Sequence, residues 1–140
     1  MNLTYLQHIA NQLSAHFGVR GVEVKFIRGR RGWYSKPNRI AIGRNAWREH
    51  TITLLHEFAH HLEFCRNGDQ LAEKNVAHGP FFVRCLFDVA EAYYGDPHQY
   101  PWRTEYRQVQ RIYQKRHALK PEQVDNRVRG KFQEELNRLF

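Results

Sequence analysis

The sequence predicts an α+β domain in which a helix comes first, a small sheet second and further helices last. Three observations support this prediction. Apolar residues recur at helical spacing near the N-terminus, short alternating or apolar runs follow between residues 22 and 43, and helical periodicity then returns to the end of the chain. The length of 140 residues suits one domain, or one domain with an extension.

The N-terminal part predicts one helix and three short strands. Residues 3–17 carry leucine, isoleucine and phenylalanine at helical spacing and stop at Gly18. Residues 22–27, VEVKFI, alternate apolar and charged side chains, which is typical of a strand. After the glycine- and arginine-rich loop RGRRG, two more short strands are expected at WYS (33–35) and RIAIG (39–43).

The C-terminal part predicts four helices. The first runs from about residue 51 to 65 and is followed by the turn RNGDQ, whereas residues 71–77 fit neither a helix nor a strand clearly. The second starts at Gly79–Pro80, because proline suits the first helical position, and continues to Gly95. The last two cover residues 102–118 and the segment from Pro121 to the end.

The net charge of +8 is unevenly distributed. Residues 20–48 hold nine basic and one acidic residue, residues 49–98 hold three basic and eight acidic residues, and residues 99–140 hold ten basic and five acidic residues. Sixteen of the 22 basic residues are arginine, whose planar fork suits phosphate. Two basic flanks favour a polyanionic partner, while the simpler interpretation is a basic solvated surface.

Other features limit where the protein acts. No apolar run approaches the roughly 20 residues that a membrane span needs, and residues 1–12 do not resemble a signal peptide. The two cysteines, Cys65 and Cys85, stand 20 residues apart and predict two free thiols. We therefore expect a cytoplasmic or nucleoid-associated protein that is neither secreted nor bound to a membrane.

The segment TITLLHEFAHHLEF (51–64) contains an HExxH motif inside an apolar helix pattern. His56 and His60 are four residues apart, so both side chains lie on one helix face and can hold one metal ion. Glu57 follows the first histidine and can act as general base on a water held by that ion. Zn²⁺ with three protein ligands would leave one position open for the water.

HExxH by itself is weakly specific, because it recurs by chance in helices. A third ligand is therefore needed to identify a metal site. His78, 18 residues after the motif and at the start of a predicted helix, is the first candidate. The other candidates are acidic: Asp69, Glu73, Asp88 and Glu91.

The HExxH motif followed by HGPFF (78–82) resembles the SprT-like (Spartan-type) zinc metalloproteases, in which HGxxF is a signature. The segment RGWYSKPNRIAIG also resembles the strands that precede the active-site helix of that family. The resemblance follows the order of elements over roughly residues 1–95. It implies that His56, His60 and His78 bind zinc, that Glu57 is the general base, and that the substrates are DNA-associated or unfolded proteins.

The resemblance also implies a zincin-like minimal metalloprotease core, with an N-terminal helix, a three-stranded sheet, an active-site helix and a second ligand-bearing helix. We assign this core to residues 1–97 and a basic helical extension to residues 98–140. Two departures from the family pattern stand out. The chain lacks the four-cysteine zinc ribbon that often follows the core, and it has Phe81 where many relatives carry glutamate.

Substrate and DNA contacts can be predicted less directly. Peptides commonly add to an exposed strand edge, and we expect the strand at 39–43 to be that edge, because it precedes the metal helix. Clustered arginines beside aromatic residues suit single-stranded nucleic acid, by stacking and phosphate contacts, and the partner we expect is single- or double-stranded DNA. The candidate DNA-binding residues are Arg28, Arg30, Arg31, Trp33, Arg103, Arg107, Arg111 and Lys115, of which the last four follow one another at steps of four.

Two other functions fit the same sequence. The first is a non-enzymatic nucleic-acid-binding protein in which zinc only stabilises the fold. The second is a narrow regulatory peptidase that cuts one repressor-like partner. Relatives of that second type usually have glutamate as third ligand, so His78 disfavours it.

Overall fold

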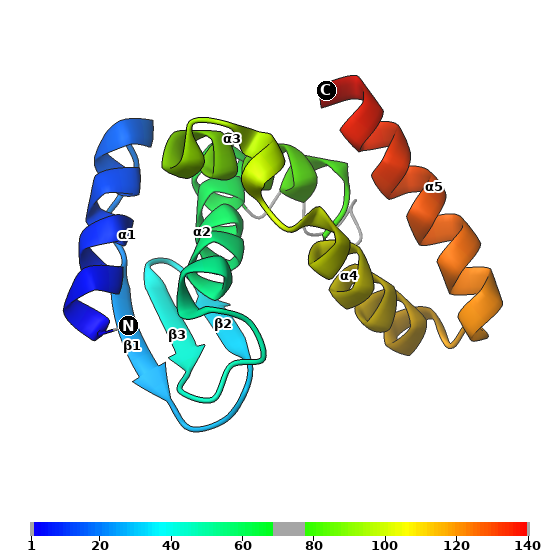
Figure 1. Cartoon of the computed structure of the whole chain (residues 1–140), viewed down its shortest axis with the longest axis horizontal. Helices are drawn as coiled ribbons and strands as arrows, with labels where there is room; N and C mark the ends of the chain where they lie inside the picture. The colour runs from blue at the N-terminus through cyan, green and yellow to red at the C-terminus, as the bar shows by residue number, and fades with distance from the viewer. Residues whose placement is uncertain (1, 69–77, 140) are drawn as a thin grey trace.

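The computed structural model describes residues 2–68 and 78–139 and has an α+β architecture (Figure 1). The described helices are α1 (Leu3–Phe17), α2 (His50–Asn67), α3 (Pro80–Tyr94), α4 (Trp102–His117) and α5 (Pro121–Leu139), with a 3-10 helix, η2, at Pro97–Gln99. The strands are β1 (Glu23–Ile27), β2 (Gly32–Ser35) and β3 (Arg39–Gly43). The elements follow the predicted order, and only η2 was missed. Residues 71–77, Asp69 and Glu73 lie outside the described residues.

Local sequence signals explain several helix ends. The side chain of Asn2 accepts a hydrogen bond from the backbone N–H of Tyr5 at 2.8 Å and caps α1. Gly18 ends the same helix in the left-handed conformation, with φ of 63°. Pro80 occupies the start of α3, where its missing N–H leaves no helical hydrogen bond unmade.

The strand order is β1-β3-β2, with β1 parallel and β2 antiparallel to β3. The expectation that residues 39–43 form an exposed edge is therefore wrong, because β3 is hydrogen-bonded on both sides. The second strand in the chain, β2, therefore lies at one edge of the sheet, and the third, β3, lies between β1 and β2. Ile40 and Ile42, which are 1% and 0% exposed, explain this order, because the most apolar strand takes the centre. The edge strand that packs against α2 is β2.

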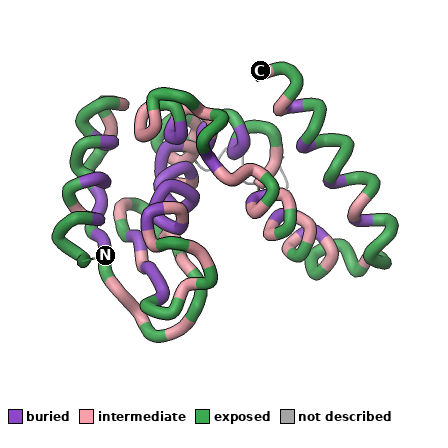
Figure 2. The backbone as a smooth tube through the Cα atoms, viewed as in Figure 1, coloured by how far each residue is buried: buried purple, intermediate pink, exposed green. Residues whose placement is uncertain are grey.

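α1 and α2 pack on one face of the sheet. α1 contacts β1, and α2 crosses β2 and β3 (Figure 1). Val24, Ile40 and Ile42 point to this helical side and are buried, whereas Lys25 and Trp33 on alternate positions are exposed. Figure 2 shows that α2 is buried along most of its length, and its residues His56 and His61 are 3% and 0% exposed.

α4 and α5 form a helical hairpin, which contacts α3 through α5 and lies on the side opposite to α1 (Figure 1). Apolar residues of α4 and α5, such as Val109 and Phe132, belong to the same buried cluster as the core of the first 97 residues. Glu135 of α5 is 1% exposed and forms ion pairs with Arg84 of α3 at 3.4 Å and Arg138 at 3.2 Å. The division at residue 97 stays a prediction. Within the described ranges, no helix is both long and apolar enough to cross a membrane.

Candidate metal centre and its cleft

Three histidines, two on α2 and one just before α3, meet at one point. His56 and His60 extend from the same face of α2, and His78 comes from the residue pair that precedes α3. The Nε2 atom of His78 lies 3.0 Å from Nε2 of His56 and 3.1 Å from Nε2 of His60. The ligand atoms of all three side chains lie within 4.8 Å of one another, so the three histidines are close enough to bind one metal ion.

The spacing fits a tetrahedral ion. Two imidazole nitrogens bound at 2.0–2.1 Å with tetrahedral angles would stand about 3.3 Å apart. The two separations to His78, 3.0 and 3.1 Å, are close to this value. An imidazole nitrogen either donates or accepts a hydrogen bond, whereas a shared cation is bound by the lone pairs of all three nitrogens at once. The sequence prediction that these three residues converge is thus confirmed in its geometry.

Phe82 forms the apolar support of the cluster. Its ring is fully buried and lies 4.4 Å from the His60 ring in a stacked arrangement. The same ring lies 4.9 Å from His56 and 4.7 Å from His78, measured between centroids. One aromatic side chain therefore contacts all three imidazoles and restricts their rotation. This contact gives a physical reason for the phenylalanine four residues after His78 in HGPFF.

The backbone at His78 is unusual. Its φ angle is +65°, in the left-handed region that non-glycine residues rarely adopt. Gly79 follows as N-cap of α3 and Pro80 as its first helical residue. This sharp entry allows a residue outside the helix to direct its ring at α2. Such strained positions persist only where the surroundings hold them, and they cluster at functional sites.

A buried carboxylate holds His56 from behind. Glu105 of α4 is 0% exposed and accepts a hydrogen bond from Nδ1–H of His56 at 2.6 Å. Arg48 and the hydroxyl of Tyr100 also donate to Glu105. Because the Nδ1 proton is committed to Glu105, neutral His56 has an unprotonated Nε2 directed at the cluster. Carboxylate–histidine pairs of this kind orient the ligands of protein metal sites.

The electrostatics of the cluster follow from this arrangement. Burial disfavours the charge of His56, but the charge and hydrogen bond of Glu105 outweigh it and raise the pKa of His56. Burial, with further repulsion from His78 and His56, lowers the pKa of His60 well below its ordinary value. Burial opposes ionisation of Glu105 as well, yet His56, Arg48 and Tyr100 together hold the pKa of Glu105 well below its usual range.

Glu57 lies beside the cluster and is 7% exposed. Burial raises the pKa of its carboxyl, and the carboxylate of Glu105 adds to the effect, while His56 and Arg48 oppose it. β2 packs directly on this part of α2: a Cβ atom added to Gly32 would stand 2.5 Å from Cγ2 of Thr53 and 3.1 Å from Cγ of Glu57. Glycine at this position therefore allows the edge strand to approach the glutamate.

The histidine cluster and Glu57 line a cleft of about 420 Å³. One wall is β2, through Gly32, Trp33 and Tyr34, and the opposite wall is α4. The other lining residues are Arg31, Trp47, Arg48, Thr53, His56, Glu57, His60, His78, Gln108, Arg111, Ile112 and Lys115. A metal held by the histidines would therefore face a space that an extended segment can enter.

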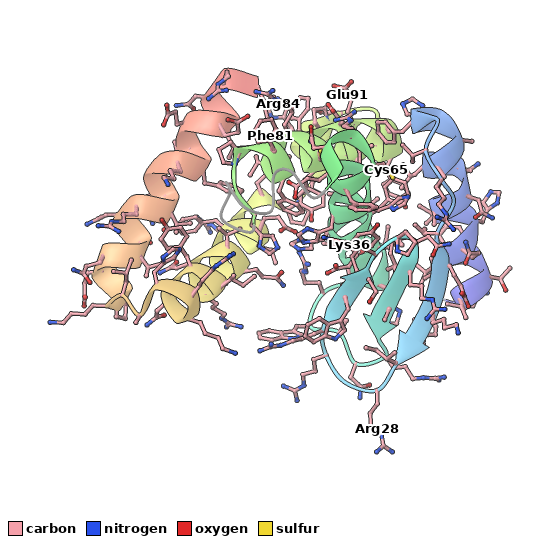
Figure 3. The ribbon with its side chains drawn as sticks, turned by 180° about the vertical axis from the view of Figure 1, so that it is seen from behind. Arg28, Lys36, Cys65, Phe81, Arg84 and Glu91 are labelled. Atoms are coloured by element: carbon pink, nitrogen blue, oxygen red, sulfur yellow. The ribbon has the colours of Figure 1, made fainter. Side chains whose placement is uncertain are left out.

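The two described acidic candidates for the third ligand, Asp88 and Glu91, lie elsewhere. Asp88 forms an ion pair with Arg66 at 2.7 Å. Glu91 is exposed and points away from the body of the protein (Figure 3). Of the described candidates, only His78 joins the cluster.

The predicted DNA-binding residues fall into two groups. All eight are exposed: Arg28, Arg30, Arg31, Trp33, Arg103, Arg107, Arg111 and Lys115. Four of them, Arg31, Trp33, Arg111 and Lys115, line the cleft. The other four do not, and Arg28 projects from the tip of the β1–β2 loop (Figure 3). The basic residues therefore do not form one surface separate from the histidine cluster.

The sequence pattern did not identify Glu105, Arg48, Tyr100 or Phe82 as parts of the centre. Comparisons with protein-family models, with curated proteins and with solved structures found no match to this chain.

Proposed function

We propose that the protein is a zinc-dependent endopeptidase of the SprT-like kind with a zincin-like core. The observation that carries the proposal is the convergence of three imidazole nitrogens beside a buried glutamate, at the wall of a cleft. Neutral nitrogen ligands without thiolates or many carboxylates suit Zn²⁺ better than Ca²⁺ or Mg²⁺. His56, His60 and His78 would hold the ion. When bound, zinc supplies Lewis acidity, which lowers the pKa of a coordinated water to about 7 and polarises a carbonyl group.

Glu57 serves as general base in this proposal. It follows the first ligand on α2 and faces the cleft, so it can take a proton from the attacking water and deliver it to the leaving amine. Burial raises the pKa of this carboxyl, which brings its basicity closer to that of a water activated near neutral pH. Glu105 contributes by holding the His56 ring in one tautomer and one orientation.

An extended peptide would add to the free edge of β2. The N–H of Gly43 donates to the carbonyl of Arg31 at 3.0 Å, so the backbone groups of Arg31 point toward β3. Alternation along an antiparallel ladder then directs the N–H and C=O of Gly32 and Tyr34 away from β3, to the free edge. Both residues line the cleft. A peptide paired there would lie along the cleft beside Glu57.

The substrates we propose are DNA-associated or unfolded proteins, encountered in the cytoplasm or on the nucleoid. Unfolded segments fit because a strand edge accepts backbone in extended form and selects against folded domains. The exposed arginines outside the cleft, Arg28, Arg30, Arg103 and Arg107, are available for phosphate contacts with DNA.

Replacing Glu57 by glutamine tests the proposal. Glu57→Gln should lower cleavage of a denatured protein substrate by about 10²–10⁴-fold, the contribution of a general base, and should leave one zinc per chain. Glu63→Gln is the matched control, because Glu63 lies on α2, is partly buried and does not line the cleft. The peptidase proposal fails if the zinc-loaded wild type cleaves nothing and Glu57→Gln binds zinc and folds like the wild type. Zinc would then only stabilise the fold.

A further inference from the structure

The cleft carries an excess of positive charge among its described lining residues. Four of them are cationic, Arg31, Arg48, Arg111 and Lys115, and one is acidic, Glu57. Arg48 forms an ion pair with Glu105. Within the described ranges, Arg31, Arg111 and Lys115 form no ion pair, and all three are exposed. Three cations are thus free to meet an anionic ligand near the histidine cluster.

Two of these cations share one helix face. Arg111 and Lys115 are four residues apart on α4, so their side chains are neighbours on the wall opposite β2. The guanidinium carbon of Arg111 lies 4.6 Å from the centroid of the Trp47 ring. This cation–π contact with the exposed indole restricts the guanidinium before a ligand arrives, which reduces the entropy lost when it binds a carboxylate.

We propose that the cleft selects acidic peptide segments. Arg111 and Lys115 of α4 bind carboxylate side chains of a peptide on β2, and Arg31, at the entry to β2, binds a further one. This specificity rests on the proposed peptidase function, because it assigns the substrate class of the same cleft. The size of the cleft, about 420 Å³, suits a few side chains of an extended peptide.

Peptide binding to a variant that does not cleave tests the specificity separately from hydrolysis. The protein is zinc-loaded Glu57→Gln, and the probes are three capped decapeptides that differ only in four positions, occupied by glutamate, glutamine or lysine. Binding is measured by isothermal titration calorimetry at low and moderate salt. The glutamate peptide should bind about tenfold more tightly than the glutamine peptide, and the lysine peptide most weakly. The preference should decline as salt rises, because exposed ion pairs are screened.

Charge reversal on α4 identifies the residues. Arg111→Glu/Lys115→Glu should reduce the preference for glutamate over glutamine to less than about twofold. Arg127→Glu/Lys131→Glu on α5 changes the net charge by the same amount, lies outside the cleft and should keep the preference. The comparison also separates the cations from the metal, since zinc could itself attract a carboxylate. Should the charge-reversed protein fail to fold, Arg111→Gln/Lys115→Gln provides the same comparison.

Three results would overturn the assignment. The first is equal affinity for the glutamate and glutamine peptides, and the second is a preference that survives in Arg111→Glu/Lys115→Glu. The third is tighter binding of a single-stranded oligothymidylate that displaces the glutamate peptide, which would make the cleft a nucleic-acid interface. Failure of the peptidase proposal looks different, because the wild type would then cleave none of the peptides while the glutamate preference persisted.

Discussion

The buried contact between Glu105 and His56 gives the most demanding prediction. Glu105→Gln keeps the size of the side chain but replaces one carboxylate oxygen by an amide NH2 group. Three donors converge on Glu105, from His56, Arg48 and Tyr100. In the variant, the new NH2 group, itself a donor, must face at least one of these donors. The variant also leaves Arg48, whose side chain is 10% exposed, without its counter-charge.

Two separate effects of Glu105→Gln can be estimated. Loss of a carboxylate that orients a ligand histidine lowers metal affinity about 10–100-fold, which corresponds to about 1.4–2.8 kcal/mol. Breaking a buried ion pair from one side lowers the free energy of unfolding by about 3–5 kcal/mol, because the remaining charge is buried without compensation. Zinc affinity is measured by competition with a chromogenic chelator, and stability by urea unfolding of the metal-free protein.

Two further variants separate these effects. Arg48→Met/Glu105→Gln removes both charges, so much of the stability should return while zinc affinity stays low. Glu135→Gln is a matched control, since Glu135 is equally buried on α5 and ion-paired with Arg84 and Arg138, but makes no contact with the histidines. It should lose stability and keep wild-type zinc affinity. If Glu105→Gln also keeps wild-type zinc affinity, Glu105 is an ordinary structural ion-pair partner and the argument is refuted.

Two more predictions follow from other parts of the structure. Gly32→Ala should lower the free energy of unfolding by about 1–3 kcal/mol and reduce cleavage, because its Cβ would stand 2.5 Å from Thr53 and must move β2 away from Glu57. Gly130→Ala, in an exposed helical position with nothing within 4 Å, should instead raise stability by about 0.5–1 kcal/mol, and urea unfolding compares the two. Burial raises the pKa of Cys85 from 9.0 to about 11, so the native state keeps the thiol proton that the unfolded chain loses, and stability should fall as pH rises from 9 to 11. Between pH 8 and 12 the wild type should lose about 2–3 kcal/mol more than Cys85→Ala, and equal losses in both proteins would contradict this.

The sequence predicted what depends on local periodicity. His56 and His60 are four residues apart, and any helix through them must place both on one face. The helix bounds at Gly18 and Pro80 were equally predictable, because glycine and proline act through their own backbone geometry. His78 required the motif around it, and its left-handed backbone could not be predicted from spacing.

What depends on tertiary packing was missed or misplaced. Glu105 is 49 residues from His56, and a single glutamate in a basic helix gives no sign that it is buried. Its position on α4 between exposed Arg103 and Arg107 resembles an ordinary surface residue. The strand order was misjudged for a similar reason: sequence order places the strand at 39–43 next to α2, whereas pairing with both β1 and β2 makes it central.

The two roles proposed for α4, support of the metal ligand His56 and binding of acidic peptides, are coupled through Glu105. The carboxylate of Glu105 accepts hydrogen bonds from Arg48, Tyr100 and His56. If α4 separated from α2, the side chain of Arg48 and the Nδ1–H of His56 would lose this acceptor, at a cost in free energy. Docking of α4 and metal affinity must therefore be linked, and such linkage is reciprocal: docking of α4 strengthens metal binding by the same free energy by which bound metal stabilises the docking. Since Arg111 and Lys115 stand on the same helix, a ligand that binds them while holding α4 against the cleft should tighten metal binding as well. On this argument, residues 98–140 complete the metal centre, and a chain cut at residue 97 should bind zinc more weakly.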